Sequence, residues 1–391
     1  MFKILTYNAI SKTGLDKLPA DCYQVSSDQT EPDAILLRSY NLHEAPIPGS
    51  VKAIGRAGAG VNNIPVAVCS ERGIPVFNAP GANANAVAEL VIAGMLFAAR
   101  NLGPAWDFAR QLQGDNETMN SLVEKEKKRF AGYELAGKTL AVVGLGAIGV
   151  RVANAATALN MRVIGFDPQM TIESAWRLST QVARAASLDE LLSQADMVTL
   201  HVPLNEQTKQ LLNAERIARL RKGAVLLNFA RAGVVDEAAV CAALQRGHLS
   251  HYVCDFPSSA LRDQPQAIAL PHLGASTEEA EENCAVMVAE QVRDFLENGN
   301  IRNAVNFPDV MLPRVAGVRL SIANRNVPGI VGQISAALAE ANLNILDLLN
   351  KSRGDYAYTL IDLSDEVPEA TLARIRHIDG VLATRIVPAG C

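Results

Sequence analysis

The sequence predicts an α/β protein in which a doubly wound parallel sheet precedes a smaller module of strands and helices. Between residues 139 and 257, helix-like segments separate most of five apolar runs: TLAVVGLGAIG, MRVIGFD, MVTLHVP, AVLLNFA and YVCDFP. Runs that are apolar on both faces are typical of parallel strands buried between helices. From residue 315 the order becomes strand, helix, strand, strand, helix and strand, which is the βαββαβ order of a ferredoxin-like module.

The regions outside these two blocks follow a similar alternation. Four short runs before residue 78 are strand-like: Phe2–Thr6, Ala34–Leu37, Val51–Ile54 and Pro75–Phe77. The stretch Asn85–Ala99 is apolar nearly all round, which predicts a buried helix. The stretch Glu278–Asn298 predicts a second long helix, which should end near Gly299.

Composition and charge limit the classes of function. The 391 residues suggest two to four domains, and a net charge of −5 gives no basic surplus that would indicate a nucleic acid or an anionic membrane as partner. None of the six cysteines forms a CxxC pair, and no run approaches the ~18 apolar residues of a membrane span. The first residues, MFKILTYNAI, are typical of a β-strand rather than of a signal peptide. We therefore expect a cytoplasmic protein without a metal site.

A GxGxxG pattern, GLGAIG at 144–149, directly follows the apolar run Thr139–Val143 and opens a helix-like segment. In this setting Gly144 allows a tight turn, Gly146 lets the backbone approach a pyrophosphate, and Gly149 permits close packing of the helix on the strand. Asp167 ends the next strand, where its carboxylate would bind an adenosine ribose and repel a 2′-phosphate. The pattern indicates an NAD site, and a glycine-rich turn without a nucleotide is the alternative.

Two polar residues follow strand-like runs, where doubly wound sheets bind their ligands. His272 follows the run AIAL, and a histidine there suits proton exchange with a hydroxyl or carbonyl group. Arg231 follows AVLLNFA, and its guanidinium could orient a 2-hydroxy acid through two hydrogen bonds to the carboxylate. A histidine that caps the next helix and a surface arginine are the alternative interpretations.

With these residues in place, the chain resembles the D-isomer-specific 2-hydroxy-acid dehydrogenase family. The matching segments occur in family order: AGAGVNNI (57–64), GIPVFNAPGANANAVAEL (73–90), GLGAIG (144–149), HVPLNEQT (201–208), LLNFARAGVVDE (226–237) and PHLGASTEEAEEN (271–283). The resemblance implies two Rossmann-like lobes, one flavodoxin-like and substrate-binding, the other an NAD-binding Rossmann lobe. The implied domains are a substrate lobe at 1–93 completed by 275–307, an NAD-binding domain at 94–274, a linker at 308–314 and a regulatory domain at 315–391.

The resemblance also implies roles for individual residues, with His272 as the general acid/base and Arg231 as the anchor of the substrate carboxylate. The implied NAD-binding residues are Gly144, Gly146, Ala147, Ile148, Gly149, Asp167, His201, Val202, Pro203, Thr208, Phe229, Ala230, Arg231, Asp255, His272 and Gly274. The implied substrate-binding residues are Arg38, Ser39, Arg56, Ala57, Gly58 and Asn62, together with Arg231 and His272.

The chain departs from the family at one catalytic position. The family places a glutamate between the arginine and the histidine, but the segment after Asp255, FPSSALRDQPQ, contains none. A carboxylate beside a histidine favours the charged imidazole and fixes its tautomer. Its absence predicts an acid–base profile shifted toward lower pH, or a substitute partner such as Glu278 or Glu279.

Three features resemble the branch of the family that oxidises D-3-phosphoglycerate. The segment ILLRSY supplies Arg38, the segment GRAGAGVNN supplies Arg56, and Val315–Val387 resembles an ACT domain, an amino-acid-sensing module. A phosphorylated substrate requires additional cations. Arg38, Arg56 and the run Lys125–Arg129 are the candidates, although a solvated helix face would also explain the run.

In the resembled ACT domains, two asparagines that match Asn326 and Asn344 hold the effector L-serine across a dimer interface. The histidine expected two residues before the first of them is Asn324 here, so effector binding is expected to be weaker, altered or absent. A dimerisation module without a ligand is the alternative. The resemblance further implies a homodimer through the catalytic core, which pairing of ACT domains would extend to a homotetramer.

The resulting expectation is NAD-dependent oxidation of D-3-phosphoglycerate to 3-phosphohydroxypyruvate, the first step of L-serine biosynthesis. A reductase of glyoxylate, hydroxypyruvate or another 2-keto acid is the second interpretation. A third, of another class, is an NADH-sensing scaffold or corepressor, because fold alone does not determine function.

Overall fold

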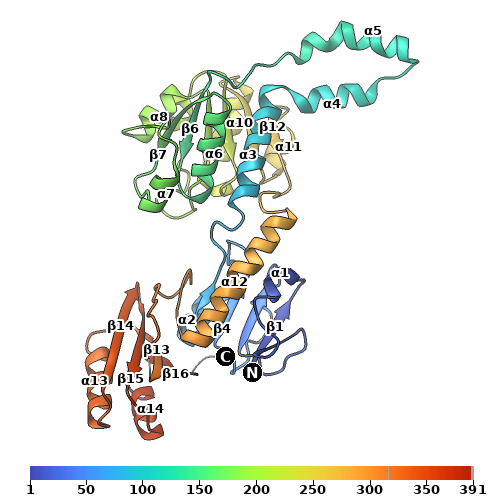
Figure 1. The fold of residues 1–391 in the computed structure, drawn as a ribbon. Coiled ribbons are helices and arrows are strands. Elements are labelled where there is room, and N and C mark those ends of the chain that lie inside the picture. The colour runs from blue at the N-terminus through green and yellow to red at the C-terminus, as the bar shows by residue number, and fades with distance from the viewer. Residues whose placement is uncertain (316, 389–391) are drawn as a thin grey trace. The chain divides into compact units, whose positions relative to one another are not determined.

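The computed structural model describes residues 1–315 and 317–388 of the chain. Residues 316 and 389–391, which belong to the predicted regulatory domain, lie outside the described residues. The chain divides into two compact units: Met1–Asn83 with Glu278–Cys391, and Ala84–Thr277. Each unit is described by itself, and both are drawn in Figure 1.

The first unit contains a parallel sheet of five strands in the order β2-β1-β3-β4-β5. Its strands are β1 (Phe2–Tyr7), β2 (Tyr23–Ser26), β3 (Ala34–Leu37), β4 (Ala53–Arg56) and β5 (Val76–Phe77). This is the flavodoxin-like strand order. Helices α1 (Lys12–Leu15) and α12 (Glu278–Asn298) pack together, and α12 also packs on the sheet, whereas α2 (Val66–Glu71) connects β4 to β5. The predicted long helix is confirmed, and it ends at Asn298, directly before Gly299, which has a positive φ of 74°.

The second unit contains a seven-stranded sheet in the order β12-β11-β10-β9-β6-β7-β8, in which all neighbours are parallel. Its strands are β6 (Thr139–Val143), β7 (Arg162–Phe166), β8 (Ala183–Arg184), β9 (Met197–Leu200), β10 (Ala224–Asn228), β11 (Leu249–Cys254) and β12 (Ala267–Ala269). Its helical connections are α6 (Ala147–Ala158), α7 (Ile172–Arg177), α8 (Leu188–Gln194), α9 (Ala214–Arg219), η2 (Ala232–Val234), α10 (Glu237–Gln245) and α11 (Ser259–Arg262). This order is that of a dinucleotide-binding doubly wound sheet with one added edge strand, as the apolar runs predicted.

The predicted buried helix is α3 (Ala84–Ala99), and it belongs entirely to the second unit. Val91 and Met95 are fully buried in the same core as Leu140 and Val152 of β6 and α6. The expected domain boundary between residues 93 and 94 therefore falls inside α3, and all of this helix belongs to the second unit. The chain passes between the units before this helix, between Asn83 and Ala84.

After α3, helices α4 (Leu102–Gln111) and α5 (Asn116–Glu126) have no buried residue, and η1 (Lys127–Phe130) follows them. In Figure 1 they extend away from the sheet of their own unit as an arm. Within the described part of the chain, no single helix is long and apolar enough to cross a bilayer. The pair α3–α4, bent by 67°, meets that criterion jointly by length and composition alone.

The C-terminal part of the first unit is an antiparallel sheet in the order β14-β15-β13-β16, as the βαββαβ pattern predicted. Its elements are β13 (Val318–Arg325), α13 (Ile330–Glu340), β14 (Ile345–Arg353), β15 (Tyr356–Leu363), α14 (Glu369–Arg376) and β16 (Val381–Val387). One face of the sheet packs on α13 and α14 through residues such as Ile322 and Ile361. On the other face, Tyr358 joins the core that contains Phe295 and Phe307 of the N-terminal lobe.

Candidate active site

The turn between β6 and α6 has the backbone that a dinucleotide requires. Gly144 has a φ of +90°, and a Cβ atom there would lie 2.6 Å from the carbonyl oxygen of His201. A Cβ at Gly149 would overlap the carbonyl oxygen of Gly144. A Cβ at Gly146 would meet nothing within 4 Å, so the first turn of α6, which includes Ala147 and Ile148, faces open space. Free N–H groups at such a turn fit a pyrophosphate.

A cavity of about 330 Å³ adjoins this turn at the carboxyl ends of β6, β7 and β9. Seven of the expected NAD-binding residues line it: Gly144, Gly146, Asp167, His201, Val202, Pro203 and Thr208. The Asp167 carboxylate accepts hydrogen bonds from the backbone N–H groups of Leu145 and Gln169, each at 2.8 Å. The cavity also includes Asn205 and Leu211, which sequence reasoning did not single out because their polarity and spacing carry no distinct signal.

His201 lines this cavity, and its imidazole is buried. Its Nε2 atom lies 2.9 Å from the hydroxyl oxygen of Thr199, and its Nδ1 atom is buried without a partner among the described residues. Burial lowers the pKa of its imidazole to about 3, so it stays neutral at physiological pH. A histidine that stays neutral over this range is a poor candidate for proton exchange.

Arg231 lies in the loop that follows β10, after Phe229 and Ala230. The fully buried Asn228 shapes this loop, since its amide donates to the carbonyl of Arg231 at 2.9 Å and its Oδ1 accepts from the Ala230 N–H at 3.2 Å. The Arg231 guanidinium is exposed and donates one hydrogen bond, at 2.7 Å, to the carbonyl oxygen of Ala230. Sequence reasoning missed Asn228, whose signal was a polar residue at the end of an otherwise apolar strand.

His272 follows β12 with a φ of +52°, a conformation that few non-glycine residues adopt. Its N–H donates to the carbonyl oxygens of Leu270 and Asp255, at 3.0 and 3.1 Å, which holds the turn. The rings of His272 and Phe256 pack edge to face, with their centroids 5.3 Å apart. Strain of this kind is typical of functional sites.

Asp255, directly after β11, is a buried carboxylate on which the charges of both expected catalytic residues act. It is 3% exposed, its Oδ2 accepts from the Gly274 N–H at 3.3 Å, and its Oδ1 has no partner among the described residues. Burial raises the pKa of Asp255, while the positive charges of His272 and Arg231 act in the opposite direction. This unit thus supplies a carboxylate beside the histidine although the family glutamate is missing. Glu278 and Glu279 begin α12 in the other unit.

The expected substrate residues of the first unit follow the carboxyl ends of β3 and β4. The carbonyl oxygen of Arg38 accepts from Arg56 Nε at 3.0 Å, and Arg38 forms an ion pair with Glu281 of α12 at 2.6 Å. Ser39 is held by its N–H, which donates to Asn8 at 3.1 Å. The loop continues through Ala57, Gly58 and Asn62, and a Cβ at Gly58 would overlap the Arg56 guanidinium. The structure thus brings these residues together at one edge of the five-stranded sheet.

The other expected binding residues are spread more widely. The run Lys125–Arg129 forms exposed ion pairs, Lys127 with Glu124 and Arg129 with Glu126, as a solvated helix surface would. Asn324 is buried and Asn326 donates to the Gly354 carbonyl at 3.0 Å, both near the carboxyl end of β13.

Asn344 lies at the other end of the same sheet. Its carbonyl accepts from the N–H of Ser364, just beyond the pair Val318–Leu363, whereas Asn326 lies beyond the pair Arg325–Tyr356. Eight residues of β13 therefore separate the two asparagines, which is roughly 20 Å or more of strand. A small ligand therefore cannot contact Asn326 and Asn344 of one chain together. It could contact both only if a second copy of the chain supplied one of them.

Comparison with known proteins places these features in a family. Residues 92–274 match the model of the D-isomer specific 2-hydroxyacid dehydrogenase NAD binding domain. A D-3-phosphoglycerate dehydrogenase of Haemophilus influenzae is 35% identical over 350 residues, which cover 86% of this chain and 81% of that protein. One of Methanocaldococcus jannaschii is 36% identical over 76% of this chain, and the match spans 55% of that longer protein.

A solved structure gives the same result. The NAD⁺-bound 3-phosphoglycerate dehydrogenase of Entamoeba histolytica matches with a TM-score of 0.60 and 26% identity, covering 78% of this chain and 98% of that chain. The residues of Ala84–Thr277 that form the cradle and cavity fit NAD, as the family model describes. The chain belongs to the family of D-isomer specific 2-hydroxyacid dehydrogenases.

Proposed function

We propose that this chain oxidises D-3-phosphoglycerate to 3-phosphohydroxypyruvate with NAD, the first step of L-serine biosynthesis. The observation that carries the proposal is that His272 and Arg231 follow strands of an NAD-binding sheet and lie close enough to the buried carboxylate of Asp255 for their charges to lower its pKa. The 35% identity to the Haemophilus enzyme over 81% of its length supports the choice of substrate.

Each residue has a defined task in this reaction. The Arg231 guanidinium binds the substrate carboxylate, so that the 2-hydroxyl group lies against His272. The His272 imidazole accepts the hydroxyl proton as the C–O bond becomes a carbonyl. NAD, when bound in the cavity beside the Gly144–Gly149 turn, would supply the acceptor for the hydride from C2. Asp255 stabilises the imidazolium that forms, because its buried negative charge attracts it.

The first unit carries the other residues that we propose to bind the substrate. Arg38, Ser39, Arg56, Ala57, Gly58 and Asn62 would bind the phosphorylated end, and the two arginines supply cations for the phosphate. We propose 1–93 with 275–307 as the substrate lobe and 94–274 as the NAD domain; the compact units divide the chain earlier, between Asn83 and Ala84.

The antiparallel sheet after the linker at 308–314 is proposed to be an ACT-type regulatory domain at 315–391, which pairs with a second copy. Pairing would bring Asn344 of one copy to Asn324 and Asn326 of the other, with L-serine as the effector. The α4–α5 arm supports a homodimer, since it has no buried residue and Trp106 is 61% exposed. Regulation requires that serine bind one conformation more tightly than the other.

The test is NADH oxidation with 3-phosphohydroxypyruvate, hydroxypyruvate or glyoxylate as substrate, each with and without L-serine. A strong preference for the phosphorylated keto acid is the expected result. Equal rates would instead indicate a general 2-keto-acid reductase, and NADH binding without turnover would indicate a scaffold. Inhibition by serine that disappears in Asn344→Ala would support the effector assignment.

Asp167→Asn should weaken NAD binding and reduce the preference for NAD over NADP by about tenfold or more, because the like charge that repels a 2′-phosphate is removed. The kcat/KM ratio for the two cofactors measures this preference. Asp167→Glu is the matched control, since it keeps the charge and should keep the preference. An unchanged ratio in Asp167→Asn would show that the ribose does not lie against this carboxylate.

Asp255→Asn should move the acidic limb of the oxidation-rate profile to lower pH, because the imidazolium loses a stabilising charge. The same variant should also be more stable than the wild type at neutral pH. Burial raises the folded-state pKa of Asp255, so the charged carboxylate destabilises the folded protein above that pKa. This destabilisation disappears below the pKa of the unfolded chain, ~3.9, where the carboxylate is protonated in both states. The variant should therefore melt at a higher temperature than the wild type at neutral pH but not at acidic pH. Identical rate profiles in the two proteins would contradict the role of Asp255.

A further inference from the structure

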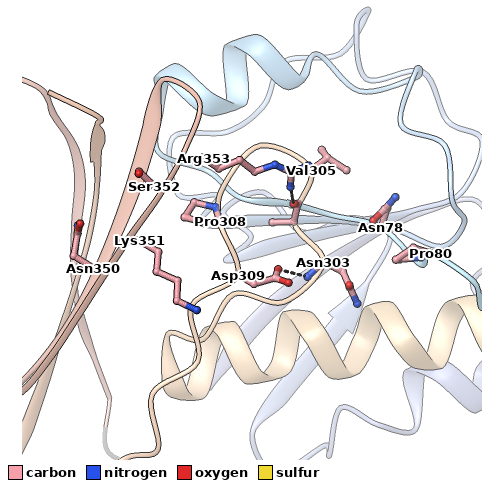
Figure 2. A pocket seen from close by; sticks show the side chains of 11 residues that line it. Asn78, Pro80, Asn303, Val305, Pro308, Asp309, Asn350, Lys351, Ser352 and Arg353 are labelled. Atoms are coloured by element: carbon pink, nitrogen blue, oxygen red, sulfur yellow. Dashed lines mark hydrogen bonds between the residues drawn. The ribbon is translucent and has the colours of Figure 1, made fainter. Parts of the chain in front are cut away.

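A second cavity lies within the first unit, between the antiparallel sheet and the N-terminal lobe. Its volume is about 780 Å³, and Figure 2 draws the residues that line it. Strand β14 contributes Lys351 and Arg353, the loop after α12 contributes Asn303 and Asp309, and the segment after β5 contributes Asn78. The seven residues of the expected NAD cavity belong to the other unit, so the two cavities are separate sites.

The charge in this cavity favours an anion. Lys351, Arg353 and Asp309 are its ionisable lining residues, which leaves one net positive charge. Lys351 Nζ forms no hydrogen bond or ion pair with any described residue. Asp309 is partly engaged, because its Oδ1 accepts from the Asn303 N–H at 2.8 Å. A lysine that the protein leaves unpaired beside a cavity is available for a ligand.

The two cations are oriented for one ligand by the strand itself. Side chains two residues apart lie on the same face of a strand, and in Figure 2 both extend from β14 toward the loop of Asn303 and Asp309. Arg353 Nη1 donates to the carbonyl oxygen of Ala304 at 2.9 Å, which fixes the guanidinium and leaves its remaining N–H groups for an acceptor. Fixed donors of this kind bind carboxylates and phosphates well.

We propose that this cavity binds a small oxyanion, a carboxylate or phosphate group of a metabolite, between the antiparallel sheet and the N-terminal lobe. Asn78 connects the cavity to the loop of Ala57 and Gly58, because its amide donates to the carbonyl oxygen of Ala59 at 2.6 Å. The next residue, Ala79, donates its N–H to the Gly58 carbonyl at 3.0 Å. Anion binding therefore orders the 57–62 loop; its consequence for catalysis rests on the proposed function.

The test is hydrogen exchange of the full chain, titrated with inorganic phosphate or malonate at constant ionic strength set by sodium chloride. Saturable protection of residues 303–309 and 350–353, with weaker protection of 57–62, is expected. Stronger protection by phosphate would identify a phosphorylated ligand, and stronger protection by malonate a carboxylate. The readout does not need turnover, so it stands whether or not the enzyme oxidises phosphoglycerate.

Lys351→Met is the diagnostic variant, because the Lys351 ammonium group has no hydrogen bond or ion pair with a described residue that the substitution would remove. It should raise the apparent dissociation constant at 303–309 by about tenfold. Lys12→Met, which removes an exposed lysine of the same unit, should leave it unchanged. Equal protection by sodium chloride alone, or equal affinity in Lys351→Met, would overturn the site. Protection of 57–62 that persists in Lys351→Met would overturn the coupling, since the anion would then bind directly at Arg38 and Arg56.

Discussion

His272→Asn is expected to lower kcat for phosphoglycerate oxidation by about two to four orders of magnitude, the usual contribution of a positioned acid/base. Asparagine tolerates the positive φ of +52° at this position, so the turn after β12 should be retained. It cannot accept the hydroxyl proton, and the transition state loses the group that carries it. Steady-state kinetics across a pH series measures the loss.

The variant should still bind NADH, since the expected cofactor cavity is built from β6, β7 and β9 and does not include His272. Quenching of protein fluorescence by NADH therefore separates lost chemistry from lost folding. His377→Asn is the matched control, because His377 lies on the antiparallel sheet module and bonds to the Ala373 carbonyl. A kcat for His272→Asn within tenfold of the wild type would exclude His272 as the acid/base.

Arg319→Met should destabilise the first unit by about 3–5 kcal/mol, the usual cost of leaving a buried charge without its partner. Arg319 is fully buried and binds both carboxylate oxygens of Asp362, at 2.6 and 2.7 Å. Its other N–H groups donate to the carbonyl oxygens of Asn298, Leu312 and Pro313 at 2.9 to 3.1 Å. One guanidinium thus attaches the antiparallel sheet to the end of α12 and to the linker.

Urea unfolding, with limited proteolysis of the linker as a second readout, measures this effect. Arg319→Met with Asp362→Leu should recover much of the loss, because no unpaired charge then remains in the interior. Arg374→Met is the exposed control. It removes the surface ion pair between Arg374 and Glu340, which should leave the urea midpoint of unfolding nearly unchanged. Arg319→Met unfolding at the wild-type urea concentration would show that the junction is held by apolar packing alone.

The cofactor-binding part of the candidate site could be predicted from the sequence. Gly144 and Gly149 are needed for local reasons, a positive φ and a close approach of helix to strand, and such requirements appear as a short motif. Asp255 differs, because its position after a strand was visible but its burial near Arg231 and His272 was not. Asn228 was missed for the same reason, since a polar residue at a strand end is exposed in some folds and buried in others.

The domain boundaries show the same contrast: the sequence pattern predicts a helix, but not the core against which the helix packs. The pattern of α3 predicted a buried helix correctly, yet nothing in Ala84–Ala99 states which core it enters. The polar stretch after residue 110 forms helix α5, whose exposed surface lacks the periodic apolar stripe that identifies a helix in sequence.

The sequence by itself determined the class of fold, the dinucleotide turn and the pair of residues expected to do the chemistry. Periodicity and turn requirements act over a few residues, so they are written in consecutive letters. Tertiary structure alone decided which charges are buried and what they meet: Arg319 reads as an ordinary strand residue until its surroundings are known, and Lys351 and Asp309 become one site when the sheet packs on the lobe. Burial and electrostatics depend on neighbours that are distant in sequence, and folding brings those neighbours together.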